Sequence, residues 1–149
     1  DEVDLVQLVT GCAEGYRAVH PDRKLNLQLP EAPCTLNCAP DLLAQALDKL
    51  VDNAMSLSSD DDEVTVLLEP ATEPGQHYAL SVRNTGTSLP DDMQERLFDS
   101  LVSLRDKRGA EPHLGLGLYI VRLVAAAHGG KVTARNLPDN AGVEFRICL

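Results

Sequence analysis

The stretch Pro112–Gly130, PHLGLGLYIVRLVAAAHGG, constrains the fold more than any other part of the sequence. Gly115 and Gly117 open an apolar run at helical spacing, which ends at His128-Gly129-Gly130. Glycine lets the backbone approach a ligand closely, and the first turn of a helix offers unpaired N–H groups with a partial positive charge. The stretch therefore predicts a flexible loop that leads into a helix over about Leu114–His128, with a phosphate bound where they meet. The alternative is a glycine-rich loop that only packs tightly.

The length and composition of the chain fit a single domain. Its 149 residues with 44% hydrophobic content are enough for one core and too few for two, so we expect one domain over residues 1–149. No apolar run reaches the roughly 18 to 20 residues that span a bilayer. The first residues, DEVDLVQLV, lack the basic head of a signal peptide. These features predict a soluble unit.

The charge of the chain disfavours nucleic acid as a partner. The formal net charge is −10, whereas nucleic-acid-binding domains usually present a basic face. An aromatic content of 3% without tryptophan leaves little surface on which bases could stack. A group of basic residues nevertheless precedes the glycine-rich stretch: Arg96, Arg105, Lys107 and Arg108. A small anion is therefore a better predicted ligand than a polyanion.

The cysteines Cys12, Cys34, Cys38 and Cys148 do not have the spacing of a metal-binding knuckle. Cys34 and Cys38 fall in a predicted strand, where residues four apart are separated by roughly 13 Å, too far for a disulfide. We expect reduced, half-buried thiols, which fit a cytoplasmic setting.

Hydrophobic periodicity gives the order of the other elements. The expected helices are Val3–Val19, Asp41–Ser58, Pro90–Val102 and Leu114–His128, and the expected strands are Lys24–Leu29, Cys34–Cys38, Val64–Leu68, Tyr78–Val82, Lys131–Asn136 and Val143–Leu149. The first few residues also allow a short strand. This order, with most strands joined as hairpins, predicts a two-layer α/β sandwich: a mixed, mostly antiparallel sheet of about five strands covered by three helices.

The helix over Asp41–Ser58 carries a broad apolar stripe, which marks one buried face. Asn53 falls at the border of that stripe, so its side chain is either a solvated border residue or a ligand for a bound group. Lys49 and its polar neighbours fit an exposed face most simply. The acidic run Ser58–Glu63 fits a solvent-facing turn.

Several segments stand at a characteristic spacing: Leu47–Ala54, Asn84-Thr85-Gly86, Leu97-Phe98 and Gly115–Val121. In order and spacing they closely resemble the N, G1, F and G2 boxes of the GHKL ATPase family, which implies the Bergerat ATP-binding fold. The closing residues are similar to the end of the catalytic ATP-binding domain of sensor histidine kinases. The stretches LFDSLVSLRD and PHLGLGLYIVRLVAAAHGG are also similar to the kinases of proteobacterial dedicated sortase systems.

The resemblance implies ATP and Mg²⁺ as ligands. Asn53 matches the N-box asparagine whose amide oxygen binds the Mg²⁺ that bridges the phosphates, and oxygen is the ligand type that this cation prefers. Asn84 and Gly86 match positions at the adenine base. The phosphates are expected on residues of the lid and the G2 box: Arg105, Lys107, Arg108, His113, Leu114, Gly115, Leu116, Gly117 and Leu118. The alternative for the lid cations is a solubilising cluster, and for His113 an ordinary lid position.

Two departures from the family pattern bear on catalysis. Asn84 stands where the family has an aspartate that accepts from the adenine amino group, and a neutral acceptor predicts adenine binding about tenfold weaker. Lys49 stands where histidine kinases commonly have an asparagine and other members a general-base glutamate. A lysine is a poor base near neutral pH, although it could bind a phosphate. Further departures are Ser88, Leu101, His113 and Val143.

The resemblance also implies partners. The usual reaction transfers the γ-phosphoryl group of ATP to a histidine on a separate helical dimerisation domain. A response regulator acts downstream of this step. No phosphoacceptor segment occurs in this sequence, so we expect a monomeric cytoplasmic fragment of a longer receptor anchored in the inner membrane. Two alternatives remain open: a pseudokinase module that signals through domain contacts, and an anti-sigma-factor serine kinase of the same superfamily.

Overall fold

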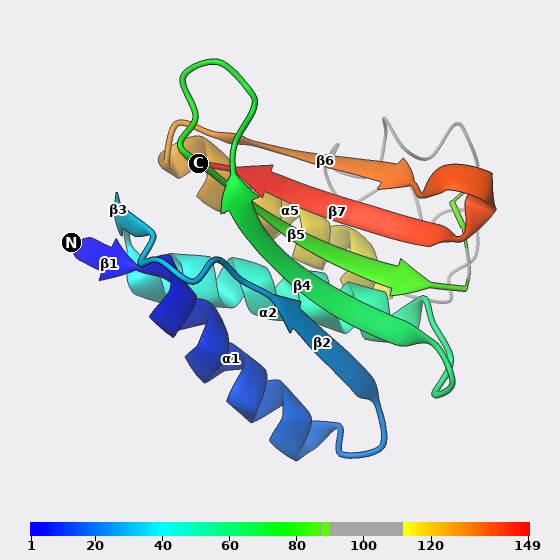
Figure 1. The fold of residues 1–149 in the computed structure, drawn as a ribbon. Helices are drawn as coiled ribbons and strands as arrows, with labels where there is room; N and C mark the ends of the chain where they lie inside the picture. The colour runs from blue at the N-terminus through cyan, green and yellow to red at the C-terminus, as the bar shows by residue number, and fades with distance from the viewer. Residues whose placement is uncertain (87, 90–111) are drawn as a thin grey trace.

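One face of a five-stranded sheet carries the core of this protein (Figure 1). The computed structural model describes residues 1–86, 88–89 and 112–149. The predicted helix over Pro90–Val102, the Leu97-Phe98 segment and the three lid cations lie outside the described residues. None of the described helices is long and apolar enough to cross a membrane.

The main sheet has the strand order β2-β4-β5-β7-β6. Its strands are β2 (Lys24–Gln28), β4 (Glu63–Pro70), β5 (Tyr78–Thr85), β6 (Lys131–Asn136) and β7 (Gly142–Cys148). β2 pairs parallel with β4, and the other neighbours pair antiparallel, which confirms the predicted mixed, mostly antiparallel sheet. A 3₁₀ turn, η1 (Pro138–Asn140), joins β6 to β7.

Three helices complete the second layer: α1 (Leu5–Val19), α2 (Pro40–Ser56) and α5 (Pro112–Ala127). α2 and α5 cover one face of the sheet, and α1 packs beside α2 along β2 (Figure 1). The apolar stripe of α2 was predicted to include Leu42, but that side chain is 40% exposed. The other members of the stripe are fully buried, as predicted: Leu43, Ala46, Leu47, Leu50, Val51 and Ala54. They meet the helix-facing side chains of the strands, among them Val66, Leu80, Phe145 and Ile147. Each large apolar side chain buried in this way contributes about 1.5–3 kcal/mol.

The predicted strand over Cys34–Cys38 does not join the main sheet. It forms β3 (Thr35–Asn37), which pairs with β1 (Glu2–Asp4) in a separate two-stranded sheet. Asp4 fixes this arrangement, because its Oδ1 accepts from the N–H groups of Val6 at 3.0 Å and Cys34 at 3.2 Å. One carboxylate therefore caps α1 and holds the residue that leads into β3.

All four cysteines are free thiols. Cys12 is half-buried, and the other three are buried more deeply than predicted. Burial is the main cause that raises the pKa of each thiol, so the thiols are neutral packing groups.

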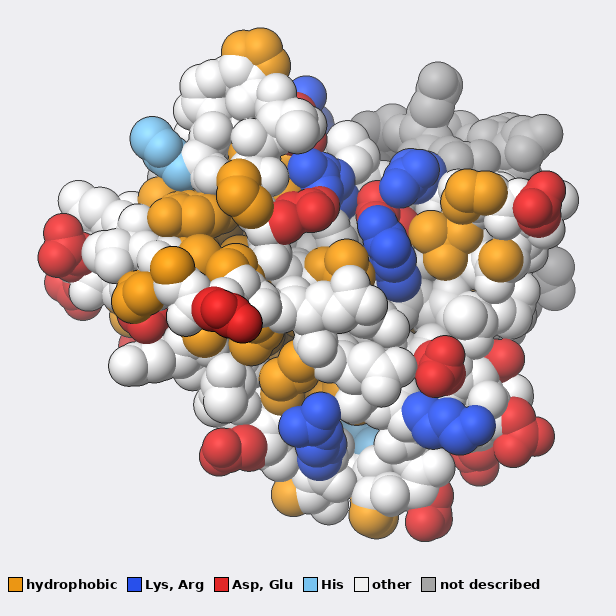
Figure 2. All heavy atoms as spheres, in the orientation of Figure 1, with side chains coloured by type: hydrophobic (Ala, Val, Ile, Leu, Met, Phe, Trp, Pro, Cys, Tyr) orange, Lys and Arg blue, Asp and Glu red, His pale blue; other side chains and the backbone are white. Residues whose placement is uncertain are grey.

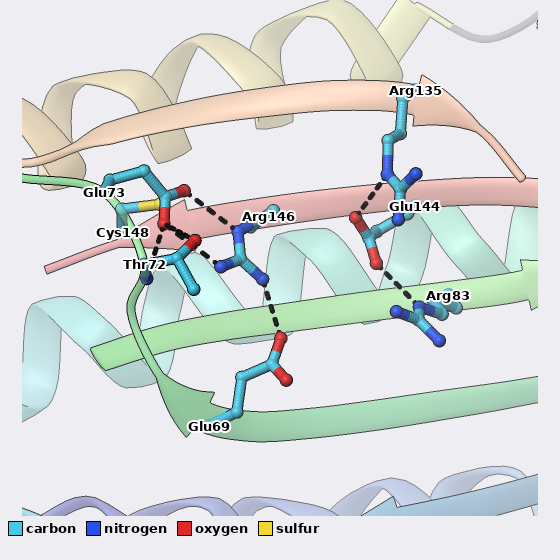
Figure 3. Close-up of polar contacts among 8 residues, drawn as sticks. All are labelled: Glu69, Thr72, Glu73, Arg83, Arg135, Glu144, Arg146 and Cys148. Atoms are coloured by element: carbon cyan, nitrogen blue, oxygen red, sulfur yellow. Dashed lines mark hydrogen bonds and ion pairs between the residues drawn. The ribbon is translucent and has the colours of Figure 1, made fainter.

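The other face of the sheet carries ion pairs (Figures 2 and 3). The buried carboxylate of Glu144, 2% exposed, accepts from Arg83 Nε at 2.6 Å and from Arg135 Nε at 2.8 Å. Beside it, Arg146 donates to Glu69 at 2.8 Å and to Glu73 at 3.1 Å. Burial raises the pKa of Glu144, but the hydrogen bonds from Arg135 and Arg83 outweigh it and leave the pKa below its usual value.

Replacing Glu144 with Gln should lower the free energy of unfolding by about 1.5–3 kcal/mol near neutral pH, because hydrogen bonds to charged groups contribute this much. The lowered pKa means that the stabilisation is present above the unfolded value of about 4.3 and is lost as the pH falls through the folded value. The free energies of unfolding of Glu144→Gln and the parent should therefore converge as the pH falls below about 4.3. Glu14→Gln, which removes an exposed carboxylate from α1, is the matched control. A deficit that is independent of pH would contradict this account.

Candidate functional site

The predicted site residues that the structure describes gather at one end of the sheet. β4 and β7 begin at this end, and β5 and β6 finish there (Figure 1). Asn84 of β5 lies opposite Val64 on one side and Val143 on the other, and Val143 in turn lies opposite Asn136 of β6. Side chains directly opposite each other share a face, so this row faces the helices.

Asn84 offers an unused acceptor within the core. Its side chain is 0% exposed, and its Nδ2 donates to the carbonyl of Thr85 at 3.2 Å. Its Oδ1 is buried and has no hydrogen-bond partner among the described residues. Leaving a buried acceptor unpaired costs about 1–3 kcal/mol. This atom is therefore suited to receive a hydrogen bond from a ligand that enters beneath the helices.

Asn53 is buried on α2 rather than solvated at the border of its stripe. It is 2% exposed, and its Nδ2 has no hydrogen-bond partner within the described residues. The oxygen and the NH2 group of an asparagine side chain are similar in shape. Rotation of the Asn53 amide group by half a turn therefore places either of them at this position. The oxygen suits a hard cation. The described residues hold no group of three or more His, Cys, Asp or Glu that could bind a metal.

Lys49 lies one turn before Asn53 and is partly exposed. The preceding Asp48 is more than part of a polar face, because its Oδ1 accepts from the hydroxyl of Tyr16 on α1. Burial, followed by this hydrogen bond, raises the pKa of Tyr16. α1 and α2 are thus joined immediately beside the lysine.

α5 begins earlier than the sequence predicted. The predicted helix over about Leu114–His128 already contained Gly115 and Gly117, and the structure extends it by two residues, so that α5 starts at Pro112. Proline needs no N–H partner in the first turn, and glycine is tolerated in a helix at a cost of about 1 kcal/mol. In an α-helix, N–H groups beyond the first turn bond to the carbonyl four residues earlier. The N–H groups of Gly117 and Leu118 are therefore engaged within α5.

The C-terminal end of α5 is tied to the N-terminal end of α2. His128 Nε2 accepts from the N–H of Ala39 at 3.0 Å, and His128 Nδ1 lies 2.8 Å from the carbonyl of Val124. His128 therefore has a structural role at this helix end. Since the two helices pack against each other, they run antiparallel, and the first turns of α5 lie beside the half of α2 that carries Asn53.

Gly86 has a neighbour that the sequence did not reveal. Its φ is +100°, and a Cβ built on it would lie 2.4 Å from Oδ2 of Asp62. That Oδ2 also accepts from the N–H of Ser59 at 2.9 Å. Hydrogen bonds from Ser59 lower the pKa of Asp62, and one from Thr85 contributes. Asp62 was read as part of a solvent-facing acidic run, and only the pairing of β4 with β5 brings it to Gly86.

The remaining predicted site residues lie wholly or partly outside the part of the chain that the structure describes. Arg105, Lys107 and Arg108 are not described, and the backbone of His113, Leu114 and Leu116 is described without side chains. A cavity of about 550 Å³ lies elsewhere, at the end of the sheet where β5 begins, and is lined by Thr35, Tyr78 and His128 among others.

Comparison with known proteins identifies the family. A profile of the histidine kinase-, DNA gyrase B-, and HSP90-like ATPases matches residues 38–149. The chain belongs to this family. Its relatives include the sensor protein CreC of Escherichia coli K12, 31% identical over 137 residues, which make up 92% of this chain and 28% of CreC. The sensor protein KdpD of the same organism is 32% identical over 125 residues, 84% of this chain and 13% of KdpD.

The solved structures agree on the fold. The mycobacterial sensor histidine kinase MprB matches with a TM-score of 0.82 at 24% identity, covering 100% of this chain and 95% of that structure. The catalytic domain of the histidine kinase ThkA also matches with a TM-score of 0.82, at 21% identity. The chain is thus a histidine kinase-type ATPase domain, homologous to sensor kinases, and spans less than a third of CreC and KdpD. The resemblance to sortase-system kinases stays a prediction.

Replacing Gly86 with Ala should destabilise the domain through both its positive φ and its contact with Asp62. Gly75 supplies the matched control, because its φ is +78° and a Cβ there would meet nothing within 4 Å. We expect Gly86→Ala to lower the free energy of unfolding by about 1–3 kcal/mol more than Gly75→Ala, measured by denaturant titration. The added replacement Asp62→Ala should recover part of that difference as a coupling energy. Equal losses at the two glycines would rule out the contact.

Proposed function

We propose that this domain binds ATP with Mg²⁺ and transfers the γ-phosphoryl group to a histidine on a separate helical dimerisation domain. The observation that carries the proposal is the unpartnered, fully buried Oδ1 of Asn84. The adenine amino group is a donor of the right kind for this atom. Membership of an ATPase family supports ATP as the ligand, and the buried acceptor of Asn84 supports recognition of the adenine base.

Mg²⁺ would be held by Asn53 together with the phosphates. A buried amide that presents an oxygen fits a cation that prefers oxygen ligands and keeps several of its sites for phosphates and water. Bound Mg²⁺ neutralises charge on the transferring phosphoryl group. No acidic cluster is needed for that chemistry.

The phosphates would be held by the start of α5. The first turn offers free N–H groups and the positive end of the helix dipole, and it lies beside the half of α2 that carries Asn53. Contacts to the N–H groups of Gly117 and Leu118 require the first turns to unwind. His113, Leu114 and the lid cations Arg105, Lys107 and Arg108 complete the proposed phosphate site.

The chain's own contribution to catalysis is positioning and charge neutralisation, which dominate phosphoryl transfer. Asn84 orients the base, the start of α5 aligns the phosphates, and Lys49 adds positive charge one turn from Asn53. The acceptor histidine is supplied by another domain, and a response regulator receives the phosphoryl group afterwards. The full-length receptor is proposed to be anchored in the inner membrane, with this domain in the cytoplasm.

A pseudokinase module is the second candidate function. The position of Lys49 favours it, because an ammonium group beside the metal site neither activates a nucleophile near neutral pH nor coordinates Mg²⁺. Such a module would bind nucleotide and signal through domain contacts without transfer. Addition of the cognate dimerisation domain divides the two candidates: acid-labile phosphohistidine supports the kinase, and its absence supports the pseudokinase.

Calorimetric titration with ATP and ADP, with and without Mg²⁺, tests nucleotide binding. We expect Mg²⁺ to strengthen ATP binding in the parent and to have no effect on Asn53→Ala, because that variant lacks the amide oxygen for the metal. Asn26→Ala removes an amide from the exposed side of β2 and serves as the control. No binding at millimolar nucleotide would refute the proposed function, and retained Mg²⁺ dependence in Asn53→Ala would refute the role of Asn53.

Replacing Asn84 with Asp should tighten ATP binding about tenfold, because a charged acceptor forms a stronger hydrogen bond with the adenine amino group. The same change should lower the stability of the free domain, since the donor to the Thr85 carbonyl is lost. Calorimetry and denaturant unfolding measure the two effects. Asn37→Asp, in β3 beside the cavity at the opposite end of the main sheet, controls for the added charge. Unchanged or weaker affinity would mean that Asn84 is adapted to a different ligand geometry.

A further inference from the structure

Asn136, the last residue of β6, holds the backbone of Leu89 with both ends of its amide. Its Oδ1 accepts from the N–H of Leu89 at 2.7 Å, and its Nδ2 donates to the carbonyl of Leu89 at 2.8 Å. The two residues are 47 positions apart in the chain. The Asn136 side chain thereby makes the two hydrogen bonds that a residue of a neighbouring strand would make, and it holds both the N–H and the carbonyl of Leu89 in place.

The register places Asn136 in the same row as Asn84. Both residues lie opposite Val143, one from each side of β7, so their side chains share the helix-facing side of the sheet. Two strand spacings separate them by roughly 9.6 Å. The unpartnered acceptor of Asn84 and the amide of Asn136 therefore mark two edges of one surface.

Hydrogen bonds tie described residues that follow Asn84 to neighbouring strands. Thr85 Oγ1 accepts from the N–H of Glu63 at 2.9 Å, which ties the start of this segment to β4. Gly86 N–H then donates to the carbonyl of Ala141 at 3.0 Å, just before β7. Leu89 is 6% exposed and belongs to the hydrophobic core cluster. Asn136 makes the hydrogen bonds that connect Leu89 to β6.

We propose that Asn136 is a positioning residue for the nucleotide base. By holding Leu89 it sets the separation between the acceptor of Asn84 and the buried residue Leu89. That separation determines how well a planar purine fits and which edge it presents to Asn84. This inference rests on the proposed function, because it concerns the base of the same nucleotide. The phosphate side of the site does not depend on it.

The position gave no signal in the sequence. Asn136 ends a predicted strand and precedes Leu137-Pro138, where an asparagine is an ordinary turn residue. Its partner lies in a segment whose course the hydrophobic pattern did not define.

Calorimetric titration of this chain with ADP and GDP tests the inference. Asn136→Ala loses both hydrogen bonds, and we expect ADP affinity to fall about tenfold together with a reduced preference for ADP over GDP. Asn136→Asp keeps an acceptor for Leu89 N–H and loses the donor to its carbonyl, so its affinity should lie between those of the parent and the alanine variant. Asn26→Ala is the control, and circular dichroism establishes that each variant is folded at the temperature used.

A purely structural role would lower thermal stability and leave both the affinity of the folded protein and its base preference unchanged. A folded Asn136→Ala variant that binds ADP as tightly as the parent, with the same preference over GDP, overturns the inference. If the alanine variant does not fold, the same result for Asn136→Asp overturns it. Failure of the parent itself to bind ADP refutes the proposed function instead, so the two failures are distinguishable.

Discussion

Burial of one face of the main sheet beneath α2 and α5 is the interaction on which the rest of the structure depends. The α2 stripe meets strand residues such as Phe145 and Ile147, and both surfaces are apolar over most of their length. At the end where β5 and β6 finish, the row through Val143 replaces apolar side chains with Asn84 and Asn136. The proposed nucleotide site lies at this end, where polar side chains take the place of apolar ones beneath the helices.

The energetics of the buried polar groups divide them into two kinds. Glu144 on the opposite face accepts from two arginines, so its burial is compensated within the protein. Asn53 and Asn84 each keep a buried atom without a partner among the described residues, at a cost of about 1–3 kcal/mol each. That cost is a sizeable share of a net stability of about 5–15 kcal/mol. A ligand that supplies the missing hydrogen-bond partners removes this cost, which is a physical reason for unpaired buried atoms to persist at a binding site.

The sequence predicted the parts of the fold that local periodicity determines. The α2 stripe, apart from the exposed Leu42, and the strands that form the β4–β5 hairpin were predicted, because spacing along the chain fixes them. The pairing of β1 with β3 was not, since it depends on Asp4 reaching Cys34 across 30 positions. Asp62 and Asn136 were missed for the same reason. Their roles arise from strand register, which brings together residues whose local sequence is that of ordinary turns.

The start of α5 was predicted to within two residues, and its composition bears on how nucleotide binding acts on the fold. Gly115 and Gly117 both lie within the helix, near its start. Each lowers helix stability by about 1 kcal/mol relative to alanine, so the first turns of α5 are its least stable part. The far end is held by the bonds of His128 to Ala39 and Val124. A ligand that takes N–H groups from the first turns therefore changes that end of the helix alone, while the contact between α5 and the start of α2 keeps the remainder in place over the sheet.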